Sequence, residues 1–315
     1  MSKIYTCTLN LAIDLFIETD SLKPFVVNRT KDDDIQANGK GVNVSLVLKM
    51  LGICNTALGF KAGFTGQYIE DFLKEKEISS DFIEVPGLTR INVFTQVNDA
   101  QEEFKLVNKG PVIPNESIHQ FLKQIEQLKA GDFLCVSGSL PRGISQDILV
   151  EIARRCYNQK VSLVIDSSYQ EVLECLKYKP FLLKPNEEEL AAWFNVPINS
   201  KKDYLYYGKK LLELGAQNVL LSLGGEGAYL FSGNSILYGN SPKGKVVNTA
   251  CAGDTLLGTF LGGVLKKESL SMTLKKSLAA GSSTAFRQGL TDFSDVEILE
   301  QEIAIYKETL DFLHK

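Results

Sequence analysis

The chain has 315 residues, of which 34 are lysine or arginine and 38 are aspartate or glutamate, so its formal net charge is −4. With 44% hydrophobic and 23% charged residues, it has the balance of a folded globular protein and not that of a disordered, collagen-like or disulfide-stapled chain. The acidic balance argues against a general nucleic-acid binder, which needs a basic surface, whereas a small phosphorylated ligand needs only a local group of cations.

Short apolar runs alternate with helix-like segments along the chain. Residues 4–9 predict a first strand, and residues 42–51 and 67–77 have the spacing of helices, the first of which ends before Gly52. Further strands are expected where apolar runs end at polar or glycine-containing loops, at 133–136, 161–165, 181–183 and 219–222. Such repeated units predict a parallel sheet buried on both faces, with ligands bound beyond the carboxyl ends of its strands.

Residues 12–37 and 88–108 break this alternation, because they are rich in β-branched and polar residues and have no helical period. We expect them to form a small β-sheet that stands off the main body as a lid. The chain has no linker-like or repeated segment, so residues 1–315 are expected to form a single α/β domain. The run Asp32-Asp33-Asp34 is expected to be solvated surface.

The sequence indicates a cytoplasmic protein with no membrane partner. No window approaches the roughly 18 consecutive apolar residues that span a bilayer, and no signal-peptide pattern is present. The six cysteines are scattered without a C-x-x-C pair and are expected to be free thiols.

The strongest chemical signal is the segment Asn248-Thr249-Ala250-Cys251-Ala252-Gly253-Asp254, which precedes an apolar run at 255–265. A helix that begins at such small residues presents unpaired N–H groups and partial positive charge, which can hold an anion. Asp254, in the first turn, can accept a proton from a substrate hydroxyl. The alternative is a plain helix start with a favourable acidic residue.

A second glycine motif, Asn38-Gly39-Lys40-Gly41-Val42-Asn43, lies just before the first predicted helix. Its two glycines allow the backbone to approach a ligand closely, with a cation alongside. The alternative is a glycine loop with a solvated lysine.

Two further loops are candidate nucleotide and metal sites. The first is Lys184-Pro185-Asn186-Glu187-Glu188-Glu189, which contains an N-x-x-E pattern. Asn186 and Glu189 are three residues apart and share one face of a helical turn, so their side-chain oxygens suit hydrated Mg²⁺. The alternative is that Asn186 is the N-cap of a helix. The loop 222–227 can wrap a nucleotide, or it is simply a glycine turn. The stretch 239–246 has Walker A spacing, but Val246 replaces the required Ser or Thr, so a P-loop is rejected.

Taken together, these segments resemble the ribokinase-like (PfkB) family of carbohydrate kinases across essentially the whole chain. Other segments resemble the ketohexose-phosphate branch of that family, which contains 1-phosphofructokinases and tagatose-6-phosphate kinases: Thr8-Leu9-Asn10 with Asp14, Asn28-Arg29-Thr30, Thr89-Arg90-Ile91-Asn92-Val93 and Ser137-Gly138-Ser139-Leu140-Pro141. The resemblance implies a three-layer α/β sandwich with a mostly parallel central sheet and a small β-sheet lid.

The resemblance also implies a role for individual residues. The residues that correspond to substrate-binding positions are Asp14, Arg29, Gly39, Lys40, Asn43, Arg90 and Ser139. Those that correspond to ATP-binding positions are Lys184, Asn186, Ser222, Gly224, Gly227 and Gly281, with Mg²⁺ held near Asn186 and Glu189, largely through water. The catalytic segment is Cys251, Ala252, Gly253 and Asp254, with Asp254 as the base.

Four residues depart from the pattern of this branch. Leu11 stands where proline is frequent, Asn38 where a first glycine is expected, Leu46 where 1-phosphofructokinases commonly carry arginine, and Cys251 where a smaller residue is usual. The Leu46 change weakens the choice of fructose 1-phosphate as the substrate, and Cys251 adds bulk beside the anion-binding motif.

The sequence therefore predicts an ATP- and Mg²⁺-dependent kinase that converts fructose 1-phosphate into fructose 1,6-bisphosphate. The alternative substrate is tagatose 6-phosphate, and the alternative of another class is a non-catalytic sugar or nucleotide sensor on the same fold. The expected partners are the phosphosugar and ATP, with no nucleic acid. Exposed lid edges make a homodimer through the lid plausible.

Overall fold

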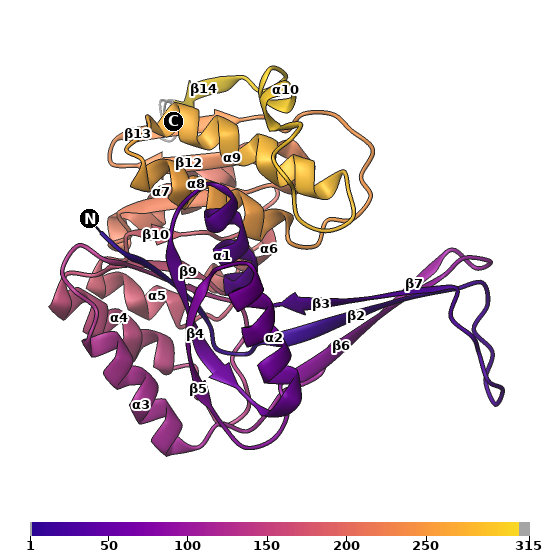
Figure 1. Cartoon of the computed structure of the whole chain (residues 1–315). Helices are drawn as coiled ribbons and strands as arrows, with labels where there is room; N and C mark the ends of the chain where they lie inside the picture. Colours follow the sequence, from indigo (N-terminus) through magenta and orange to yellow (C-terminus); the bar gives the residue numbers. More distant parts are fainter. Residues whose placement is uncertain (1, 309–315) are drawn as a thin grey trace.

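A ten-stranded sheet lies at the centre of the computed structural model, which describes residues 2–308 (Figure 1). Its strand order is β14-β13-β12-β11-β10-β9-β8-β1-β4-β5. Seven neighbouring strands are parallel: β5 (Ser79–Glu84), β4 (Asn55–Lys61), β1 (Ile4–Thr8), β8 (Phe133–Ser137), β9 (Ser162–Asp166), β10 (Leu182–Leu183) and β11 (Asn218–Ser222). The parallel sheet predicted from the apolar runs is confirmed.

An antiparallel extension at one edge of the sheet was not predicted. It consists of β12 (Ala228–Ser232), β13 (Ser235–Gly239) and β14 (Ile305–Glu308). No helix begins at Val246, in agreement with the rejection of a P-loop there.

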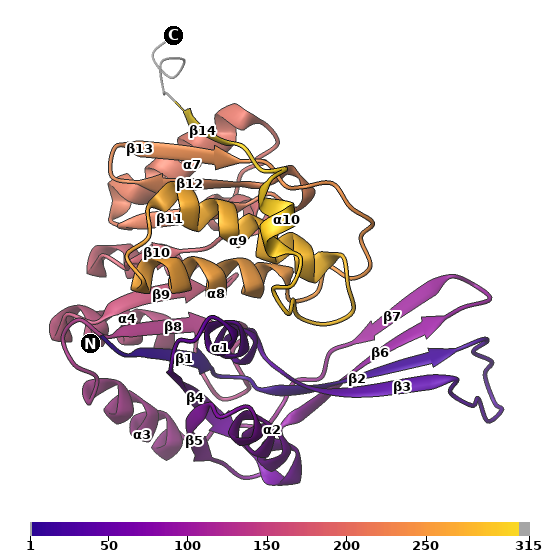
Figure 2. The ribbon, with the colours of Figure 1, turned by 45° about the horizontal axis from the view of Figure 1, so that its top comes forward.

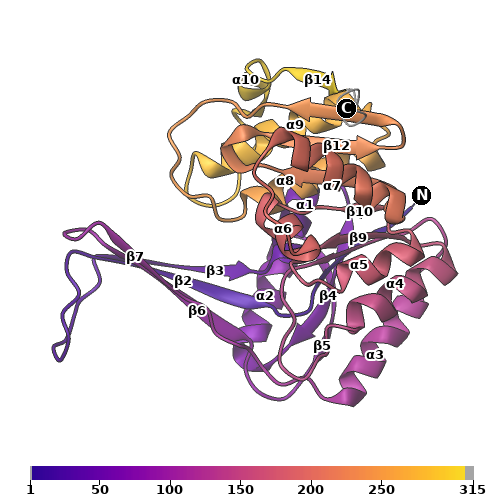
Figure 3. The same ribbon diagram turned by 180° about the vertical axis from the view of Figure 1, so that it is seen from behind.

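Helices cover both faces of the sheet. One face carries α1 (Lys40–Met50), α2 (Gly63–Glu75), α8 (Ala252–Leu265), α9 (Leu270–Ala285) and the short α10 (Val296–Glu300). The other carries α3 (Asn115–Glu126), α4 (Ile148–Gln159), α5 (Val172–Cys175), α6 (Glu187–Phe194) and α7 (Lys201–Leu214). Figure 3, which views the molecule from behind, shows these helices. The helices predicted at 42–51 and 67–77 are α1 and α2, which begin two and four residues earlier than expected.

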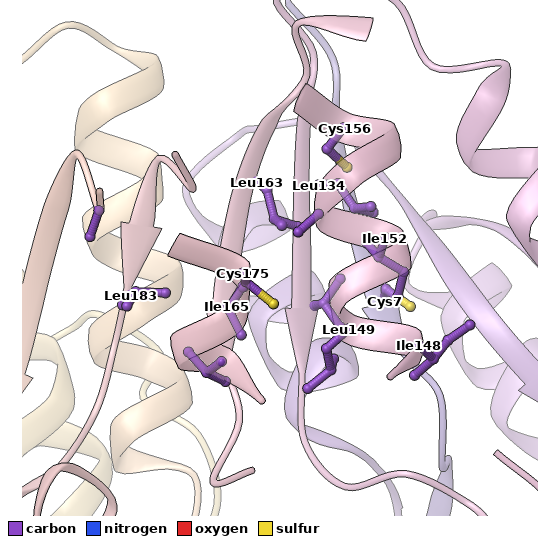
Figure 4. Close-up of a cluster of buried hydrophobic side chains, with 14 of the residues drawn as sticks. Cys7, Leu134, Ile148, Leu149, Ile152, Cys156, Leu163, Ile165, Cys175 and Leu183 are labelled. Atoms are coloured by element: carbon purple, nitrogen blue, oxygen red, sulfur yellow. The ribbon is translucent and has the colours of Figure 1, made fainter. Parts of the chain in front are cut away.

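Alternate residues of each central strand point into opposite helix layers. In β9, for example, Leu163 and Ile165 pack with α4, whereas Val164 packs with α8 and α9 on the other face. Figure 4 shows the first of these clusters, where Cys7, Cys156 and Cys175 are buried free thiols. Burial holds the pKa of Cys156 and Cys175 at about 12. All six cysteines are free, as predicted.

A second, four-stranded sheet projects from the body, and we call it the lid sheet (Figures 1 and 2). Its order is β3-β2-β6-β7, with β2 (Ala12–Thr19), β3 (Asp32–Asn38), β6 (Arg90–Val97) and β7 (Glu102–Leu106). These strands fall within the two irregular stretches noted in the sequence, except that β3 runs one residue further, to Asn38. The three aspartates of β3 are exposed. No helix of the described chain is long and apolar enough to span a membrane.

Candidate active site

The carboxyl ends of β1, β8 and β9 meet the base of the lid sheet, and α1 and α8 begin there and pack against each other (Figure 2). Two glycines of the motif at residues 38–43 allow this arrangement. A β-carbon on Gly39 would lie 2.6 Å from Thr8 Cγ2, and one on Gly41 would lie 2.9 Å from the Cys7 carbonyl oxygen. The motif therefore brings the start of α1 directly against the end of β1.

A buried group of ions lies at this point. Asp166, at the end of β9, is fully buried, and its Oδ1 lies 3.2 Å from Lys40 Nζ and 3.1 Å from Lys184 Nζ. Burial opposes ionisation of Asp166, but the two lysines outweigh it and hold its pKa below the usual value. Lys40 Nζ also lies 3.9 Å from Glu189 Oε1. Lys40, predicted to bind substrate, is thus paired with two carboxylates in the structure.

Asp254 lies in the first turn of α8, close to this ion group. Its side chain is buried, and its Oδ2 accepts a hydrogen bond from Asn43 Nδ2 at 2.8 Å. Burial and the negative charge of Asp166 raise the pKa of Asp254 to about 7, against the opposing effects of Lys40, Asn43 and Lys184. A carboxylate with this pKa can take up and release a proton at neutral pH.

The segment before Asp254 turns sharply into α8. Cys251 has φ 64°, a left-handed conformation that is uncommon for a residue with a side chain, and its Sγ accepts a hydrogen bond from Asn43 at 3.2 Å. The Ala252 N–H donates to the Thr249 carbonyl at 3.3 Å. A β-carbon on Gly253 would lie 3.5 Å from Lys184 Nζ, so the lysine ammonium lies next to the start of the helix. An ammonium beside a helix N-terminus attracts an anion.

The lid contributes a second carboxylate. Asp14, on β2, is buried and accepts hydrogen bonds from Asn92 Nδ2 at 2.8 Å and from Asn38 Nδ2. Burial raises the pKa of Asp14, and the two amides and Arg90 oppose that rise. Asp14 and Asp254 are joined through Asn38 and Asn43, so the structure brings together the predicted sugar-binding and catalytic residues.

Arg90 lies at the base of the lid, at the start of β6. Its Nη2 donates to the Asn10 carbonyl at 3.1 Å and to Ser139 Oγ at 3.4 Å, and its Nη1 donates to the Asn108 carbonyl at 3.2 Å. The buried Nε of Arg90 has no partner among the described residues. Arg90 lines a cleft of about 600 Å³ together with two further cations, Lys109 and Arg142. Arg90 and Ser139 are therefore adjacent, as a shared phosphate site requires.

Arg29 is not brought to this site within one chain. It is exposed in the loop between β2 and β3. Figure 2 shows this loop at the outer end of the lid. Asp14 pairs with Gln36 near the base, whereas Glu18 pairs with Asp32 towards the tip. Four residues of strand span about 13 Å, and Arg29 lies beyond them.

Asn186 and Glu189 form a reciprocal cap at the start of α6. Asn186 Oδ1 accepts from the Glu189 N–H at 2.7 Å, and Glu189 Oε2 accepts from the Asn186 N–H at 3.1 Å. In the structure, Asn186 and Glu189 therefore form a capping box, which is the alternative to a metal site given by the sequence. Glu189 Oε1 faces Lys40, and the buried Oδ2 of Asp166 has no hydrogen-bond partner among the described residues.

The predicted nucleotide loop lies next to this cap. The Ser222 N–H donates to the Pro185 carbonyl at 3.0 Å, and the glycine turn follows between β11 and β12. Gly224 and Gly227 both have positive φ, and a β-carbon on Gly227 would lie 1.9 Å from the Gly239 carbonyl oxygen. Gly281 is buried in α9, where a β-carbon would lie 3.2 Å from the Ala252 carbonyl oxygen of α8. Gly281 thus lies at a helix contact behind the anion-binding motif.

Several site residues received no role from the sequence: Asp166, Asn38, Asn92, Lys109 and Arg142. The available signal for Asp166 was its place at the end of a buried parallel strand, where ligand-binding residues collect. Asn38 belongs to the glycine motif, and Asn92 belongs to the segment Thr89–Val93 that resembles the family branch, but neither received a role of its own. Lys109 and Arg142 depend on how the lid packs against the body, which no local motif encodes.

Comparison with known proteins agrees with this arrangement. Residues 5–297 match the family model described as pfkB family carbohydrate kinase. The chain is 47% identical over 303 residues to a D-tagatose-1-phosphate kinase of Bacillus licheniformis, covering 96% of this chain and 99% of the relative. It is 38% identical over 302 residues to a 1-phosphofructokinase of Bacillus subtilis, with the same coverage.

A solved structure shows the same architecture. Phosphofructokinase-2 of Escherichia coli matches with a TM-score of 0.89 and 26% identity, covering 96% of this chain and 99% of the other. The ribokinase-like sandwich with a smaller sheet is confirmed by this likeness. The chain belongs to the pfkB family of carbohydrate kinases and is therefore a phosphosugar kinase by family.

Proposed function

We propose that this chain is an ATP-dependent kinase that phosphorylates the C6 hydroxyl of a ketohexose 1-phosphate, with fructose 1-phosphate as the main substrate and fructose 1,6-bisphosphate as the product. The observation that carries the proposal is the position of Asp254, a buried carboxylate linked through Asn43 to the lid residues and lying next to Lys184. A substrate hydroxyl on one side of Asp254 and a phosphoryl donor on the other would meet at this carboxylate.

A second substrate follows from the relatives. The name of the relative with 47% identity specifies tagatose 1-phosphate, the C4 epimer of fructose 1-phosphate, and several others are named 1-phosphofructokinase. Both names place the existing phosphate on C1. We therefore propose tagatose 1-phosphate as the second substrate, ahead of the tagatose 6-phosphate predicted from the sequence.

In the proposed reaction, Asp254 accepts the proton of the attacking hydroxyl. The first-turn N–H groups of α8 and the Lys184 ammonium stabilise the charge of the group being transferred, because both are positive and close together. Asp14 and Asn43 hold sugar hydroxyls, and Arg90, with Ser139 beside it, binds the existing phosphate. ATP supplies the phosphoryl group when it is bound.

The residues near Lys40 fit the Mg²⁺ that kinases of this family typically use. The buried, unpartnered Asp166 Oδ2 and the Glu189 carboxylate share Lys40 as a neighbour and provide hard oxygen ligands. The described residues contain no cluster of three or more acidic, histidine or cysteine side chains suited to a metal. We therefore propose that Asp166, Glu189 and Asn186 hold the ion largely through water, while the loop 222–227 contacts the nucleotide.

We also propose a homodimer formed through the lid sheet. Strand pairing places Leu15, Ile17 and Ile35 on one face of the lid, and Val93, Phe104 and Leu106 share that face. The three members of this set on β3 and β7 are well exposed. A second copy that covered this face would bury apolar surface.

The test is coupled ADP release from the purified chain with five acceptors: fructose 1-phosphate, tagatose 1-phosphate, tagatose 6-phosphate, fructose 6-phosphate and free ribose. We expect kcat/KM to be at least tenfold higher for the two 1-phosphates than for the others. A preference for a 6-phosphate would overturn the placement of the phosphate, and activity on ribose alone would overturn the role of Arg90. Binding of a sugar phosphate without ADP release from any acceptor would support the sensor alternative.

A further inference from the structure

One amide, the side chain of Asn38, lies between the two functional carboxylates. Asn38 is the last residue of β3, directly before the start of α1. Its Nδ2 donates to Asp14 Oδ2, and its Oδ1 accepts from Asn43 Nδ2 at 2.9 Å. Asn43 Nδ2 in turn donates to Asp254 Oδ2 at 2.8 Å. A continuous row of side chains therefore joins Asp14 to Asp254.

The chemistry of this row fixes how Asn38 is oriented. An ionised carboxylate only accepts hydrogen bonds, so the amide must turn its NH₂ towards Asp14. Its carbonyl oxygen then faces Asn43 and receives the amide hydrogen of that residue. A side chain that links these two neighbours must carry a donor at one end and an acceptor at the other, which an asparagine does and an alanine or glycine does not.

The row also crosses from the lid to the body. Asp14 and Asn38 belong to β2 and β3 of the lid sheet, whereas Asn43 belongs to α1 and Asp254 to α8 (Figure 2). A displacement of the lid would therefore change the distance between Asp14 and Asp254 unless Asn38 keeps both hydrogen bonds.

We propose that Asn38 is a positioning residue: through Asn43, it fixes the position of the sugar-binding carboxylate Asp14 relative to the base Asp254. This role rests on the proposed function. It adds a residue of the lid to the machinery that orients the acceptor hydroxyl, and it makes correct placement of the base depend on the position of the lid.

The most informative variant is Asn38→Asp, which keeps the size and the acceptor but replaces the donor towards Asp14 by a second carboxylate. Two carboxylates in contact repel when both are ionised and share a proton at lower pH, which restores a hydrogen bond. We therefore compare kcat/KM for fructose 1-phosphate between variant and wild type at each pH from 8 to 5.5. Taking this ratio removes the titration of Asp254 as it occurs in the wild type. A further rise in the pKa of Asp254, caused by the added carboxylate, would lower the ratio at low pH, which is opposite to the expected change.

The expected ratio is about 0.1 or lower at pH 8 and rises at least fivefold by pH 5.5. The matched control is Asn98→Asp, which makes the same change beside a carboxylate of the same lid sheet, because Asn98 Nδ2 donates to Glu18 Oε1 at 2.8 Å. Its ratio should stay near 1 at every pH. A ratio for Asn38→Asp that does not change with pH would overturn the positioning role.

Asn38→Ala provides the second variant if Asn38→Asp does not fold. It removes the hydrogen bonds with Asp14 and Asn43, and also the one that Asn38 Oδ1 accepts from the Gly39 N–H. The kcat/KM for the sugar phosphate should therefore fall at least tenfold at every pH, while the KM for ATP stays within twofold. An unchanged kcat/KM would overturn the role of Asn38 while leaving the proposed function intact. A wild-type protein with no turnover on any sugar phosphate would overturn the proposed function and this role together.

Discussion

The substitution Asp254→Asn separates the chemical role of this residue from its structural role. The amide keeps an oxygen that can accept the hydrogen bond from Asn43, so the local geometry is retained, but it cannot accept the proton of a hydroxyl. General bases contribute about 10²- to 10⁴-fold to rate, so kcat should fall by that factor, or about 3–5 kcal/mol in activation free energy. The KM for ATP should stay within about threefold, because Lys184 and the loop 222–227 are unchanged.

The same substitution should raise stability. Because the pKa of Asp254 is raised from 3.8 to about 7 in the folded protein, the native state binds the proton more tightly than the unfolded chain does. The stability contribution of Asp254 therefore falls as pH rises from about 4 to about 7, by at most roughly 4 kcal/mol. The gain on Asp254→Asn should grow across this window and level off above it. In wild type, kcat should rise with pH through about 7, as the base ionises.

The assay is steady-state ADP release together with thermal unfolding at pH 5 and pH 8. The control is Asp203→Asn, which changes a half-buried aspartate in the first turn of α7, where hydrogen bonds from Ser200 hold the pKa of Asp203 below its usual value. That control should keep wild-type kcat and melt slightly earlier at pH 8. Near-normal turnover of Asp254→Asn, or a lower melting temperature at pH 8, would refute this account of the residue.

Three further predictions address the phosphate site, the ion group and the lid. Arg90→Ala should raise the KM for the phosphosugar at least tenfold with little change in the KM for ATP, whereas the surface variant Arg154→Ala should change neither KM. Equal KM values for Arg90→Ala and wild type would exclude Arg90 from phosphate binding. Asp166→Asn leaves the two flanking lysines without their buried counter-ion. It should therefore lower the free energy of unfolding, measured with urea, by about 3–5 kcal/mol. A loss below about 1 kcal/mol would contradict the burial of this ion group. Leu106→Asp places a charge on the apolar face of the lid and should shift the protein from dimer to monomer in sedimentation velocity; a monomeric wild type would contradict the proposed dimer.

Much of the fold could be predicted because the central strands are continuously apolar. Runs such as 133–136 and 161–165 are hydrophobic on both faces of the sheet, which is characteristic of parallel strands between two helix layers. The lid could be predicted for the opposite reason, since its strands mix polar and β-branched residues. The antiparallel strands β12 to β14 could not, because a tight hairpin and a distant terminal strand have no repeating unit to reveal them.

The parts of the candidate site that lie in a local motif could be predicted from the sequence. The parts whose position depends on tertiary packing could not. The glycine motif and the segment ending at Asp254 each precede a helix, so their place in the fold follows from local sequence. Asp166 has no motif of its own, and its importance appears only when β9 is paired with its neighbours. The resemblance implies that Arg29 and Arg90 both bind substrate, but the strand register places Arg29 at the far end of the lid.

Whether Asn186 binds a metal or caps a helix was open in the sequence, because both readings use the same oxygen atoms. The structure has the reciprocal cap, with Glu189 Oε2 engaged and Oε1 directed at Lys40. One carboxylate can hold the cap with one oxygen and face the active site with the other, so capping accounts for the local geometry without removing the second oxygen from the site.

The central claim is that this chain transfers a phosphoryl group from ATP to C6 of a ketohexose 1-phosphate. The most direct measurement is ³¹P NMR of the products formed from ATP and fructose 1-phosphate. The account predicts equal amounts of ADP and fructose 1,6-bisphosphate, formed at least about a hundredfold more slowly when Asp254→Asn replaces the wild type at the same concentration. ADP accompanied only by inorganic phosphate, or a bisphosphate formed equally well by the variant, would contradict it.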